Sequence, residues 1–319
     1  MTILNVYFHK DFDGFVAAAL FLRINDESQL IGAVSPSLNA VDYSIKETWL
    51  KTKLSQPSVV IDFLYHPRAE WWFDHHVSTF LNEKHKEKYQ NSEKQYWNIK
   101  APSCAALIKD NLQQSCSLFM SSDDYSRIVN SFSDWIYWSD IIDNAKYENP
   151  AQVVELNHPC LQINETLTGD VEDHYIYNLV TAAKMYTPAE VIHLKDIKGK
   201  IDTVLTMRDN NLKIFKNGYK ALPKDVVLFN YVEHEIPFQR YMTYYYEPEA
   251  RYAVGLYKRN GTFSISVGKN PWREFASKNI GEICQKYGGG GRENVGSVII
   301  ANYTQALNIT NDIINSLTM

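Results

Sequence analysis

Cysteine is scarce in this sequence, and the cysteines present form no pairing motif. The four cysteines, Cys104, Cys116, Cys160 and Cys284, lie far apart and make no CxxC pair. Free thiols in a reducing cytoplasm are therefore expected, rather than a disulfide framework.

Long hydrophobic runs are missing as well. No apolar stretch approaches the roughly 18 residues that a membrane-spanning helix needs. The first apolar run, Ile3 to Phe8, leads straight into charged residues, so no signal peptide is expected. These two absences predict a cytoplasmic protein that does not act in a membrane.

An excess of positive charge is the third absence. Lysine and arginine together number 32, against 37 aspartates and glutamates, which gives a net charge of −5. Proteins that coat long duplex DNA without sequence preference usually have a basic surface. Any nucleic-acid substrate is therefore expected to be short, or to be bound by a local patch.

The composition that is present is that of a globular protein with two domains. Hydrophobic residues make up 45% of the 319 residues and charged residues 22%, which excludes wholesale disorder. A chain of this length suits two domains of roughly 150 residues each. The expected division is a first domain over 1–190, a connecting helix over 191–220 and a second domain over 221–319.

The N-terminal half predicts an α/β fold in which short strands alternate with helices. Its expected strands are Ile3 to Phe8, Leu30 to Val34, Ser58 to Asp62 and Glu70 to Phe73. One expected helix covers Gly14 to Leu22, and another opens at Pro102, with Ser103 as its N-cap. Such alternation is typical of a parallel sheet with helices on both faces.

The C-terminal half predicts a smaller α/β domain, joined to the first by a long helix from about Thr187 to Lys216. Arg259-Asn260-Gly261 has the composition of a hairpin turn. The aromatic run Tyr241 to Tyr246 is expected to be a strand rather than a base-stacking platform. The other expected strands are Val226 to Phe229, Arg251 to Tyr257, Thr262 to Val267 and Ser297 to Asn302.

Acidic and histidine residues cluster where the predicted strands of the first domain end. Because the carboxyl ends of parallel strands meet in one crevice, these side chains are expected to lie close together. The clusters are His9-Lys10-Asp11-Phe12-Asp13-Gly14, Asp62, Asp74-His75-His76, and Asp140 within Trp138-Ser139-Asp140-Ile141-Ile142-Asp143.

Such a concentration of acids needs a compensating charge. Several carboxylates in one crevice repel one another strongly unless a cation is present. Three or four aspartates with two or three histidines are a plausible ligand set for two divalent metal ions. Mixed imidazole and carboxylate ligands favour Mn²⁺, with Mg²⁺ as the weaker alternative. Two such ions suit in-line attack on phosphorus, because they stabilise the attacking and the leaving oxygen together.

Each cluster taken alone also has a simpler interpretation. The cluster at His9 fits a solvated turn, and Asp62 alone fits a helix cap or a turn. Their joint placement, each after a predicted strand, favours one shared metal site. His66, close to Asp62, is a further candidate. The remaining histidines lack acidic partners at ligand spacing and are expected on the surface: His85, His158, His174, His193 and His234.

At these residues the sequence resembles the DHH phosphoesterase superfamily, whose name-giving motif reads Asp74-His75-His76 here. The resemblance covers the four signatures of the family's N-terminal domain. The second half is similar to the DHH-associated domain of RecJ-type exonucleases and bacterial nano-RNases, whose glycine signature reads Gly288-Gly289-Gly290-Gly291-Arg292. The resemblance implies a manganese-dependent hydrolase, a phosphoesterase of the exonuclease or oligoribonuclease type.

The resemblance also implies roles for individual residues. His76 would face the scissile phosphate, and Asp74 would orient a histidine ring. Two positions depart from the family pattern: Tyr7 stands where many members have the first histidine, and Arg292 where a histidine usually follows the glycines. The implied ligands of the two ions, with Asp62 shared between them, are His9, Asp11, Asp13, Asp62, His75 and Asp140.

The glycine run from Gly288 to Gly291 has a physical use of its own. Backbone N–H groups of residues without a Cβ can converge closely on a phosphate, and Arg292 could add a bidentate contact. A plain helix terminus is the alternative. Ser266 and Lys269, where a strand ends, are further candidate substrate contacts, with an ordinary strand end as the alternative.

Three functions stay open from the sequence. The first is hydrolysis of short single-stranded RNA or DNA, or of linear dinucleotides, to mononucleotides. The second is hydrolysis of pyrophosphate, polyphosphate or a cyclic dinucleotide. The third is a nucleic-acid-binding module that has lost its metals, and the complete ligand set argues against it. A homodimer is compatible with all three.

Overall fold

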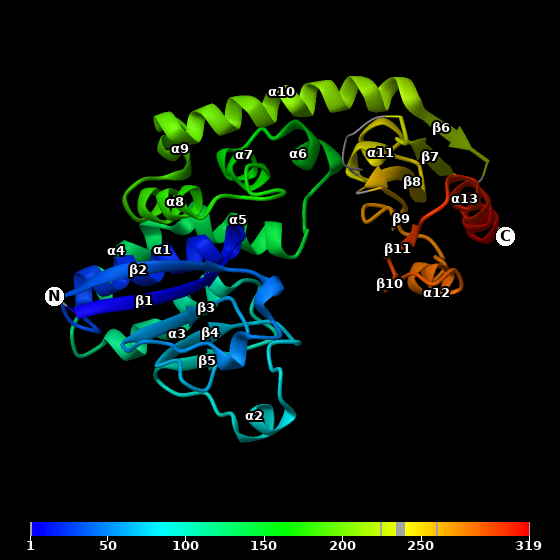
Figure 1. Cartoon of the computed structure of the whole chain (residues 1–319). Helices are drawn as coiled ribbons and strands as arrows, with labels where there is room; N and C mark the ends of the chain where they lie inside the picture. The colour runs from blue at the N-terminus through cyan, green and yellow to red at the C-terminus, as the bar shows by residue number, and fades with distance from the viewer. Residues whose placement is uncertain (1, 224, 234–239, 260, 319) are drawn as a thin grey trace. The chain divides into compact units, whose positions relative to one another are not determined.

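The computed structural model describes residues 2–223, 225–233, 240–259 and 261–318, which form two compact units (Figure 1). Unit 1 comprises Met1–Tyr147 and Asn157–Val204, and unit 2 comprises Glu148–Leu156 and Leu205–Met319. The boundary between them falls within the long helix α10 (Lys195–Gly218). The division at residues 190 and 220 stays a prediction.

Unit 1 is built on a five-stranded parallel sheet, which confirms the fold class predicted for the N-terminal half. The strands lie in the order β2-β1-β3-β4-β5. Their bounds are β1 (Thr2–His9), β2 (Val34–Val41), β3 (Ser58–Ile61), β4 (Trp71–Asp74) and β5 (Gln95–Trp97).

The second strand begins later than its sequence predicts. The expected strand from Leu30 to Val34 is wrong, because that segment forms the turn between α1 and β2. Gln29 and Gly32 have left-handed φ angles of 55° and 82°, and the Ile31 N–H donates to Asn25 Oδ1 over 2.9 Å. The hydrophobic pair Leu30-Ile31 therefore belongs to a turn that reverses the chain.

Helices cover one face of this sheet, and loops with short helices cover the other. Phe21 of α1 packs against Trp71 and Phe73 of β4, with ring centroids 6.0 and 5.7 Å away. On the opposite face, Trp49 joins Trp72 in a buried cluster. The helices of unit 1 are α1 (Phe12–Ser28), α2 (Glu83–Lys88), α3 (Cys104–Cys116), α4 (Ser122–Ser131), α5 (Ser133–Asp143), α7 (Pro159–Glu165), α8 (Asp173–Met185), α9 (Pro188–Val191), and the 3-10 turns η1 (Tyr43–Ile45) and η2 (Trp49–Lys51).

The strand order creates a switch point beside β1. This strand pairs with β2 on one side and with β3 on the other, so the chain leaves β1 and β3 toward opposite edges of the sheet. Ligands of open parallel sheets bind at the carboxyl ends of strands flanking such a point. His9 closes β1, and Asp62 follows β3 directly.

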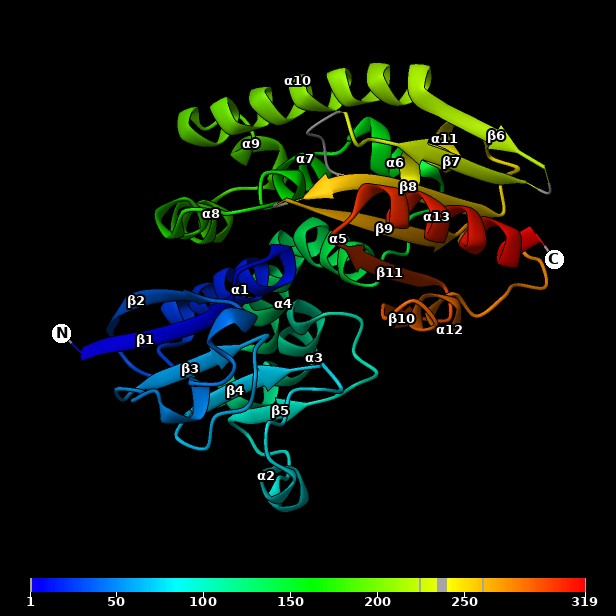
Figure 2. The same cartoon turned by 45° about the vertical axis from the view of Figure 1, so that its right-hand side comes forward.

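Unit 2 is built on a six-stranded mixed sheet in the order β10-β11-β9-β8-β7-β6, in which β7 and β8 pair in parallel. Figure 2 shows α13 lying along this sheet, where Ile309 and Ile313 join its buried core. Its strands are β6 (Tyr219–Leu222), β7 (Val226–Asn230), β8 (Tyr252–Arg259), β9 (Thr262–Lys269), β10 (Gly290–Arg292) and β11 (Val295–Ile300). Its helices, besides the second part of α10, are α6 (Pro150–Glu155), α11 (Arg240–Tyr246), α12 (Ile280–Gln285) and α13 (Tyr303–Thr318).

The aromatic run of unit 2 is a helix, so its assignment as a strand is wrong. The run forms α11, in which Met242 and Tyr246 pack into one cluster and Tyr244 into another. The buried Tyr244 hydroxyl donates to the Gly268 carbonyl over 2.8 Å. Packing on two sides at helical spacing therefore outweighs the strand preference of tyrosine.

Two further expectations concern the hairpin of the second domain and membrane-spanning helices. The antiparallel pairing of β8 and β9 is as predicted, although Asn260, in the expected turn, lies outside the described residues. Among the described helices, none combines the length and the apolar character needed to cross a membrane.

Candidate metal centre

The first part of the centre is formed where β1 passes into α1. Asp11 caps α1, because its Oδ1 accepts the Gly14 N–H over 2.9 Å. Its Oδ2 lies 2.6 Å from His9 Nδ1. A Cβ on Gly14 would lie 2.2 Å from the His9 carbonyl oxygen, so only glycine lets the helix begin this close to the strand. The motif thus brings an imidazole and a carboxylate together.

Asp13 is held in place by the N-terminus of a second helix. Its Oδ2 accepts the Cys104 N–H over 2.6 Å, and its Oδ1 accepts the Ala105 N–H over 3.1 Å. These amides open α3, whose N-cap is Ser103 as predicted. The positive end of a helix favours a carboxylate. Asp13 is nevertheless almost fully buried, so its carboxylate has lost nearly all contact with water.

Asp62 lies at the middle of the centre with a strained backbone. Its φ angle is 56°, in the left-handed region that non-glycine residues seldom adopt. Its N–H donates to the Phe73 carbonyl over 2.8 Å, which ties it to β4. The side chain is fully buried, and within the described part of the chain neither carboxylate oxygen has a hydrogen-bond partner.

Asp74 organises the turn that carries the two histidines. Its Oδ1 accepts the backbone N–H groups of His75 and His76 over 2.7 and 3.1 Å and lies 2.8 Å from His76 Nδ1. The Thr79 hydroxyl donates to its Oδ2. Trp97 Nε1 donates to the His76 carbonyl over 2.9 Å. Asp74 therefore orients a histidine ring, the role that the family resemblance implies.

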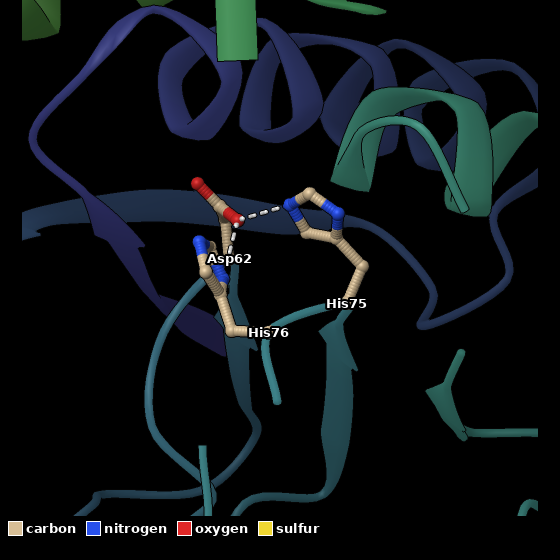
Figure 3. A group of neighbouring side chains, drawn as sticks. All are labelled: Asp62, His75 and His76. Atoms are coloured by element: carbon tan, nitrogen blue, oxygen red, sulfur yellow. Dashed lines mark ion pairs between the residues drawn. The ribbon is translucent and has the colours of Figure 1, made fainter. Parts of the chain in front are cut away.

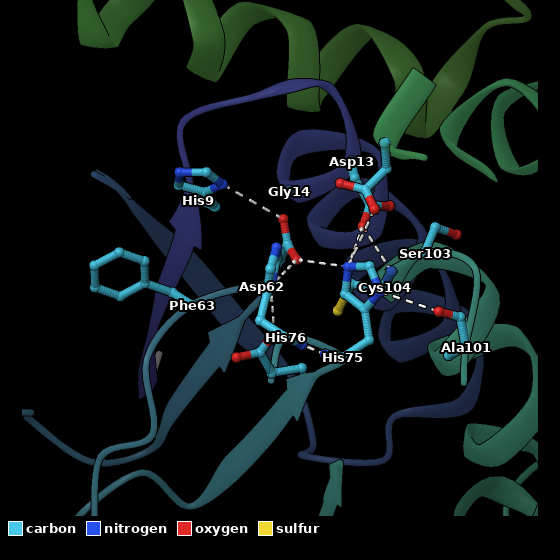
Figure 4. Close-up of polar contacts among 12 residues, drawn as sticks. His9, Asp13, Gly14, Asp62, Phe63, His75, His76, Ala101, Ser103 and Cys104 are labelled. Carbon is cyan, nitrogen blue, oxygen red and sulfur yellow. Dashed lines mark hydrogen bonds and ion pairs between the residues drawn. The ribbon is translucent and has the colours of Figure 1, made fainter. Parts of the chain in front are cut away.

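His75 points its free nitrogen at three carboxylates. Its Nδ1 lies 3.1 Å from the Ala101 carbonyl, which accepts its proton, so Nε2 faces the acids (Figure 4). Nε2 is 3.5 Å from Asp62 Oδ1, 3.7 Å from Asp13 Oδ2 and 3.6 Å from Asp143 Oδ2. His76 Nδ1 approaches Asp62 Oδ1 to 3.6 Å from the other side (Figure 3).

Asp143 is the residue of this centre that the sequence interpretation missed. The predicted ligand Asp140 lies within helix α5 and not after a strand, and its Oδ1 accepts the Ser103 hydroxyl over 2.5 Å. Asp143, three residues further along the same helix, is the one that faces His75. The two acids are three residues apart, so on a helix they lie on nearly the same face. The sequence interpretation placed the segment at the end of a strand and therefore did not use this spacing.

Charges that are not balanced shift the pKa values of the centre. Burial lowers the pKa of His9, but the neighbouring charges of Asp11 and Asp62 outweigh burial and raise it to about 11. For His75, Asp62 and Asp13 likewise outweigh burial and raise the pKa to about 10. The pKa of Asp13 is raised by burial and by the neighbouring Asp62 charge. Without a cation, the acids thus hold their histidines in the charged form.

The pKa values of Asp143 and His76 are raised as well. Burial, with Asp62 nearby, raises the pKa of Asp143 to about 6 although His75 lowers it. The hydrogen bond to Asp74 raises the pKa of His76. Asp62 is the exception, because the nearby charged rings of His75 and His9 outweigh the effect of burial and lower its pKa.

The residues present fit two divalent cations. Ligand atoms within 4.8 Å of one another form a group of His9, Asp11 and Asp62, a group of Asp13, His75 and Asp143, and a group of Asp62, His75 and His76. Asp62 belongs both to the group with His9 and to the group with His75 and His76. His75 Nε2 and both Asp62 oxygens are buried without hydrogen-bond partners in the described chain. Buried charged groups of this kind need a cation, and imidazole with carboxylate is the set that Mn²⁺ accepts.

The remaining histidines lie away from these groups. His66 is buried against Trp49, with ring centroids 5.3 Å apart, and its Nδ1 accepts the Arg68 N–H, so it belongs to the core. His158 is half-buried and stacks on Trp138 at 4.3 Å, which corrects its expected surface position. His234 lies outside the described residues.

The predicted phosphate contacts belong to unit 2. Gly290 to Arg292 form the edge strand β10, paired with β11. A Cβ on Gly291, whose φ is 154°, would lie 2.1 Å from the Val295 carbonyl oxygen, which explains one glycine by close strand pairing. The N–H groups of Gly288 and Gly289 donate to the carbonyls that end α12. These two donors are therefore already used within the chain.

The side chains expected beside the glycine run stay candidates. Arg292 is exposed, and Ser266 and Lys269 are half-buried on β9. The Lys269 ammonium lies 5.1 Å from the centroid of the Phe275 ring. Their role in substrate binding stays a prediction.

Comparison with known proteins places this architecture. The sequence matches no protein-family model and no curated protein. The structure is similar to the pGpG-specific phosphodiesterase PggH of Vibrio cholerae, with a TM-score of 0.72 and 17% identity over 100% of this chain and 99% of that one.

Two other solved structures share the arrangement less closely. RecJ of Thermus thermophilus in complex with Mn²⁺ has a TM-score of 0.54 and 10% identity, over 99% of this chain and 52% of RecJ. An exopolyphosphatase-related protein of Bacteroides fragilis has a TM-score of 0.50 and 10% identity, over 99% and 92%. The chain therefore has the fold of the DHH phosphoesterases, as its motifs predict.

Proposed function

We propose that this protein is a metal-dependent phosphodiesterase that hydrolyses linear dinucleotides or short single-stranded oligonucleotides to mononucleotides. The observation that carries the proposal is Asp62, a buried carboxylate without hydrogen-bond partners in the described chain, shared by two groups of metal-ligating side chains. A fold similar over its whole length to a pGpG-specific phosphodiesterase supports the dinucleotide as substrate. Mn²⁺ is the proposed ion, with Mg²⁺ as the alternative.

The candidate ligands form two groups, one for each ion. His9, Asp11 and Asp62 would hold one ion, and Asp13, Asp143, His75 and Asp62 the other. When bound, two such ions supply positive charge that stabilises the attacking and leaving oxygens of an in-line displacement. Asp62 belongs to groups on both sides and would therefore help to hold both ions.

His76 is the residue proposed to contact the phosphate. Its Nδ1 bonds to Asp74, so its Nε2 is free to face a substrate, and its side chain is 30% exposed. The hydrogen bond to Asp74 raises its pKa, which favours the charged form of the ring. A charged imidazole there would donate a hydrogen bond to a phosphate oxygen, a charge-assisted and therefore stronger bond.

A substrate panel tests the proposal. The panel consists of pGpG, RNA and DNA of two to twenty nucleotides, a cyclic dinucleotide, pyrophosphate and polyphosphate, each with Mn²⁺, Mg²⁺, Ca²⁺ or chelator. We expect hydrolysis of pGpG and the shortest oligonucleotides, stronger with Mn²⁺ than with Ca²⁺, and none in chelator. Full activity in chelator would contradict the metal centre. Preference for polyphosphate would replace the nucleotide substrate by the alternative.

A further inference from the structure

Tyr43 lies beside the metal centre, against His9, without being one of its candidate ligands. It is the first residue of η1, two residues after β2 ends at Val41, and Val41 is the sheet partner of His9. Asp42 Oδ1 accepts the Ser44 N–H over 2.7 Å and so fixes the turn. The fold therefore holds Tyr43 at the carboxyl edge of the sheet, where the ligand residues lie.

The ring of Tyr43 is supported by neighbours but not covered by them. Its centroid lies 5.1 Å from that of His9, at an interplanar angle of 69°, and 5.4 Å from that of Phe63, at 45°. Phe63 follows Asp62 directly in the chain. The residue is nevertheless 41% exposed. A large aromatic ring is thus held rigidly beside the first group of ligands, with much of its surface open.

Tyr43 also differs in charge from the exposed side chains around it. A tyrosine phenol is neutral at neutral pH, because its ordinary pKa is about 10. The other partly exposed side chains of the centre carry charge: Asp11, His76 and Asp143 are 39%, 30% and 21% exposed. Those groups suit ions and phosphate oxygens, whereas Tyr43 offers a flat apolar surface.

We propose that Tyr43 stacks on the nucleobase next to the scissile phosphate and thereby selects nucleotides over inorganic phosphates. The inference rests on the proposed function and names the substrate class of the same centre. Stacking on an aromatic ring accepts any base, because every base has a π-face. Support from His9 and Phe63 keeps the ring in position before substrate binds, which lowers the entropy lost on binding.

Paired substrates separate stacking from chemistry. Tyr43→Leu removes the ring and Tyr43→Phe keeps it, and both are assayed on a linear dinucleotide and on an abasic dinucleotide with the same backbone. We expect Tyr43→Leu to lower kcat/KM for the dinucleotide about 10–100-fold, the range of one base–aromatic stack, and to change the abasic substrate less than about threefold. Tyr43→Phe should behave as wild type. Tyr186→Leu is the matched control, because Tyr186 is 47% exposed at the end of α8.

Binding gives a second readout that does not need turnover. A dinucleotide containing 2-aminopurine, bound in the presence of Ca²⁺, should lose fluorescence on stacking against Tyr43. We expect quenching with wild type and Tyr43→Phe and its loss with Tyr43→Leu. Mn²⁺ affinity, measured by calorimetry, should be the same for all three proteins, because the ligands themselves are unchanged.

The outcomes are distinct. Equal loss on both substrates, together with weaker Mn²⁺ binding, would overturn the inference and show that Tyr43 acts by supporting His9. No loss on either substrate, with quenching retained in Tyr43→Leu, would overturn it as well. If wild type hydrolysed no dinucleotide, the proposed function would fail, and the quenching measurement would still decide whether Tyr43 contacts a base.

Discussion

His75 Nε2 lies 3.5 Å from Asp62 Oδ1, and neither atom has a hydrogen-bond partner in the described chain. The Ala101 carbonyl accepts the Nδ1 proton of His75. Nε2 therefore carries either a lone pair for a metal ion or a second proton that neutralises Asp62. A cation and a proton compete for this nitrogen, and the competition makes both metal affinity and stability depend on pH.

The first prediction is that chelated protein loses stability as pH rises. The pKa values of His9 and His75 are raised to about 11 and 10, so their stabilising effect is complete below pH 6.5 or so and is lost toward those values. The raised pKa of Asp13 acts in the same direction, because the folded state binds its proton more tightly. The effect of Asp143, whose pKa is about 6, is lost already below this pH range. Tm in chelator should therefore be lower at pH 9 than at pH 6.5.

Mn²⁺ should reverse this trend. Ligands must lose their protons before they bind a metal, so the rise in Tm on adding Mn²⁺ should grow between pH 6 and pH 8. Differential scanning calorimetry with and without the ion measures both effects. A Tm increment independent of pH would contradict the competition at His75.

The second prediction concerns the shared carboxylate. Asp62→Asn removes the charge that faces both ion sites, and we expect kcat/KM to fall at least ~10³-fold, the scale of losing a major electrostatic stabiliser. Asp123→Asn, at an exposed position on α4, is the control and should change little. Equal effects of the two substitutions would show that the centre lies elsewhere.

The third prediction separates two acids of helix α5. Asp143 Oδ2 lies 3.6 Å from His75 Nε2, whereas Asp140 accepts a hydrogen bond from Ser103. Asp143→Asn should therefore weaken Mn²⁺ binding and lower kcat/KM at least about 100-fold. Asp140→Asn keeps an oxygen for Ser103 and should stay within about fivefold of wild type. Titration calorimetry with Mn²⁺ and steady-state kinetics check both, and the reverse order would restore Asp140 as the ligand.

The fourth prediction concerns Arg292 in unit 2. If this exposed side chain binds a phosphate of the substrate, Arg292→Ala should weaken hydrolysis of a dinucleotide by about 1.5–3 kcal/mol, the range for a charge-assisted hydrogen bond. That corresponds to about 10–100-fold in kcat/KM. A small activated phosphodiester should change less than about threefold. Lys286→Ala, another exposed cation near the end of α12, is the control. Equal loss on both substrates would assign Arg292 a role other than substrate binding.

The parallel sheet and most of its acidic edge follow from the sequence because strand ends have a local signature. A short β-rich run that ends in Asp62 or precedes Asp74 needs no tertiary information to be recognised. Asp143 was missed for the opposite reason. Its segment is apolar enough for a strand, but it forms α5, which packs against α1 and α3.

Tertiary packing also explains the other differences. Tyrosines from Tyr241 to Tyr246 favour strands by themselves, yet two separate clusters bury them at helical spacing. Leu30 and Ile31 have the hydrophobic character of a strand, but Asn25 fixes them in a turn. Tyr43 has no sequence signal at all, because its place beside His9 depends on the pairing of β1 with β2.

The helix that begins at Cys104 connects the metal centre to backbone amides that can be observed one by one. Its first two amides donate to Asp13 rather than to carbonyl groups. Deuterium exchange at Cys104 and Ala105 should consequently report the ionisation of a buried side chain. The two amides form a built-in probe, and NMR of an isotope-labelled sample would follow occupancy of the centre through them without substrate or turnover.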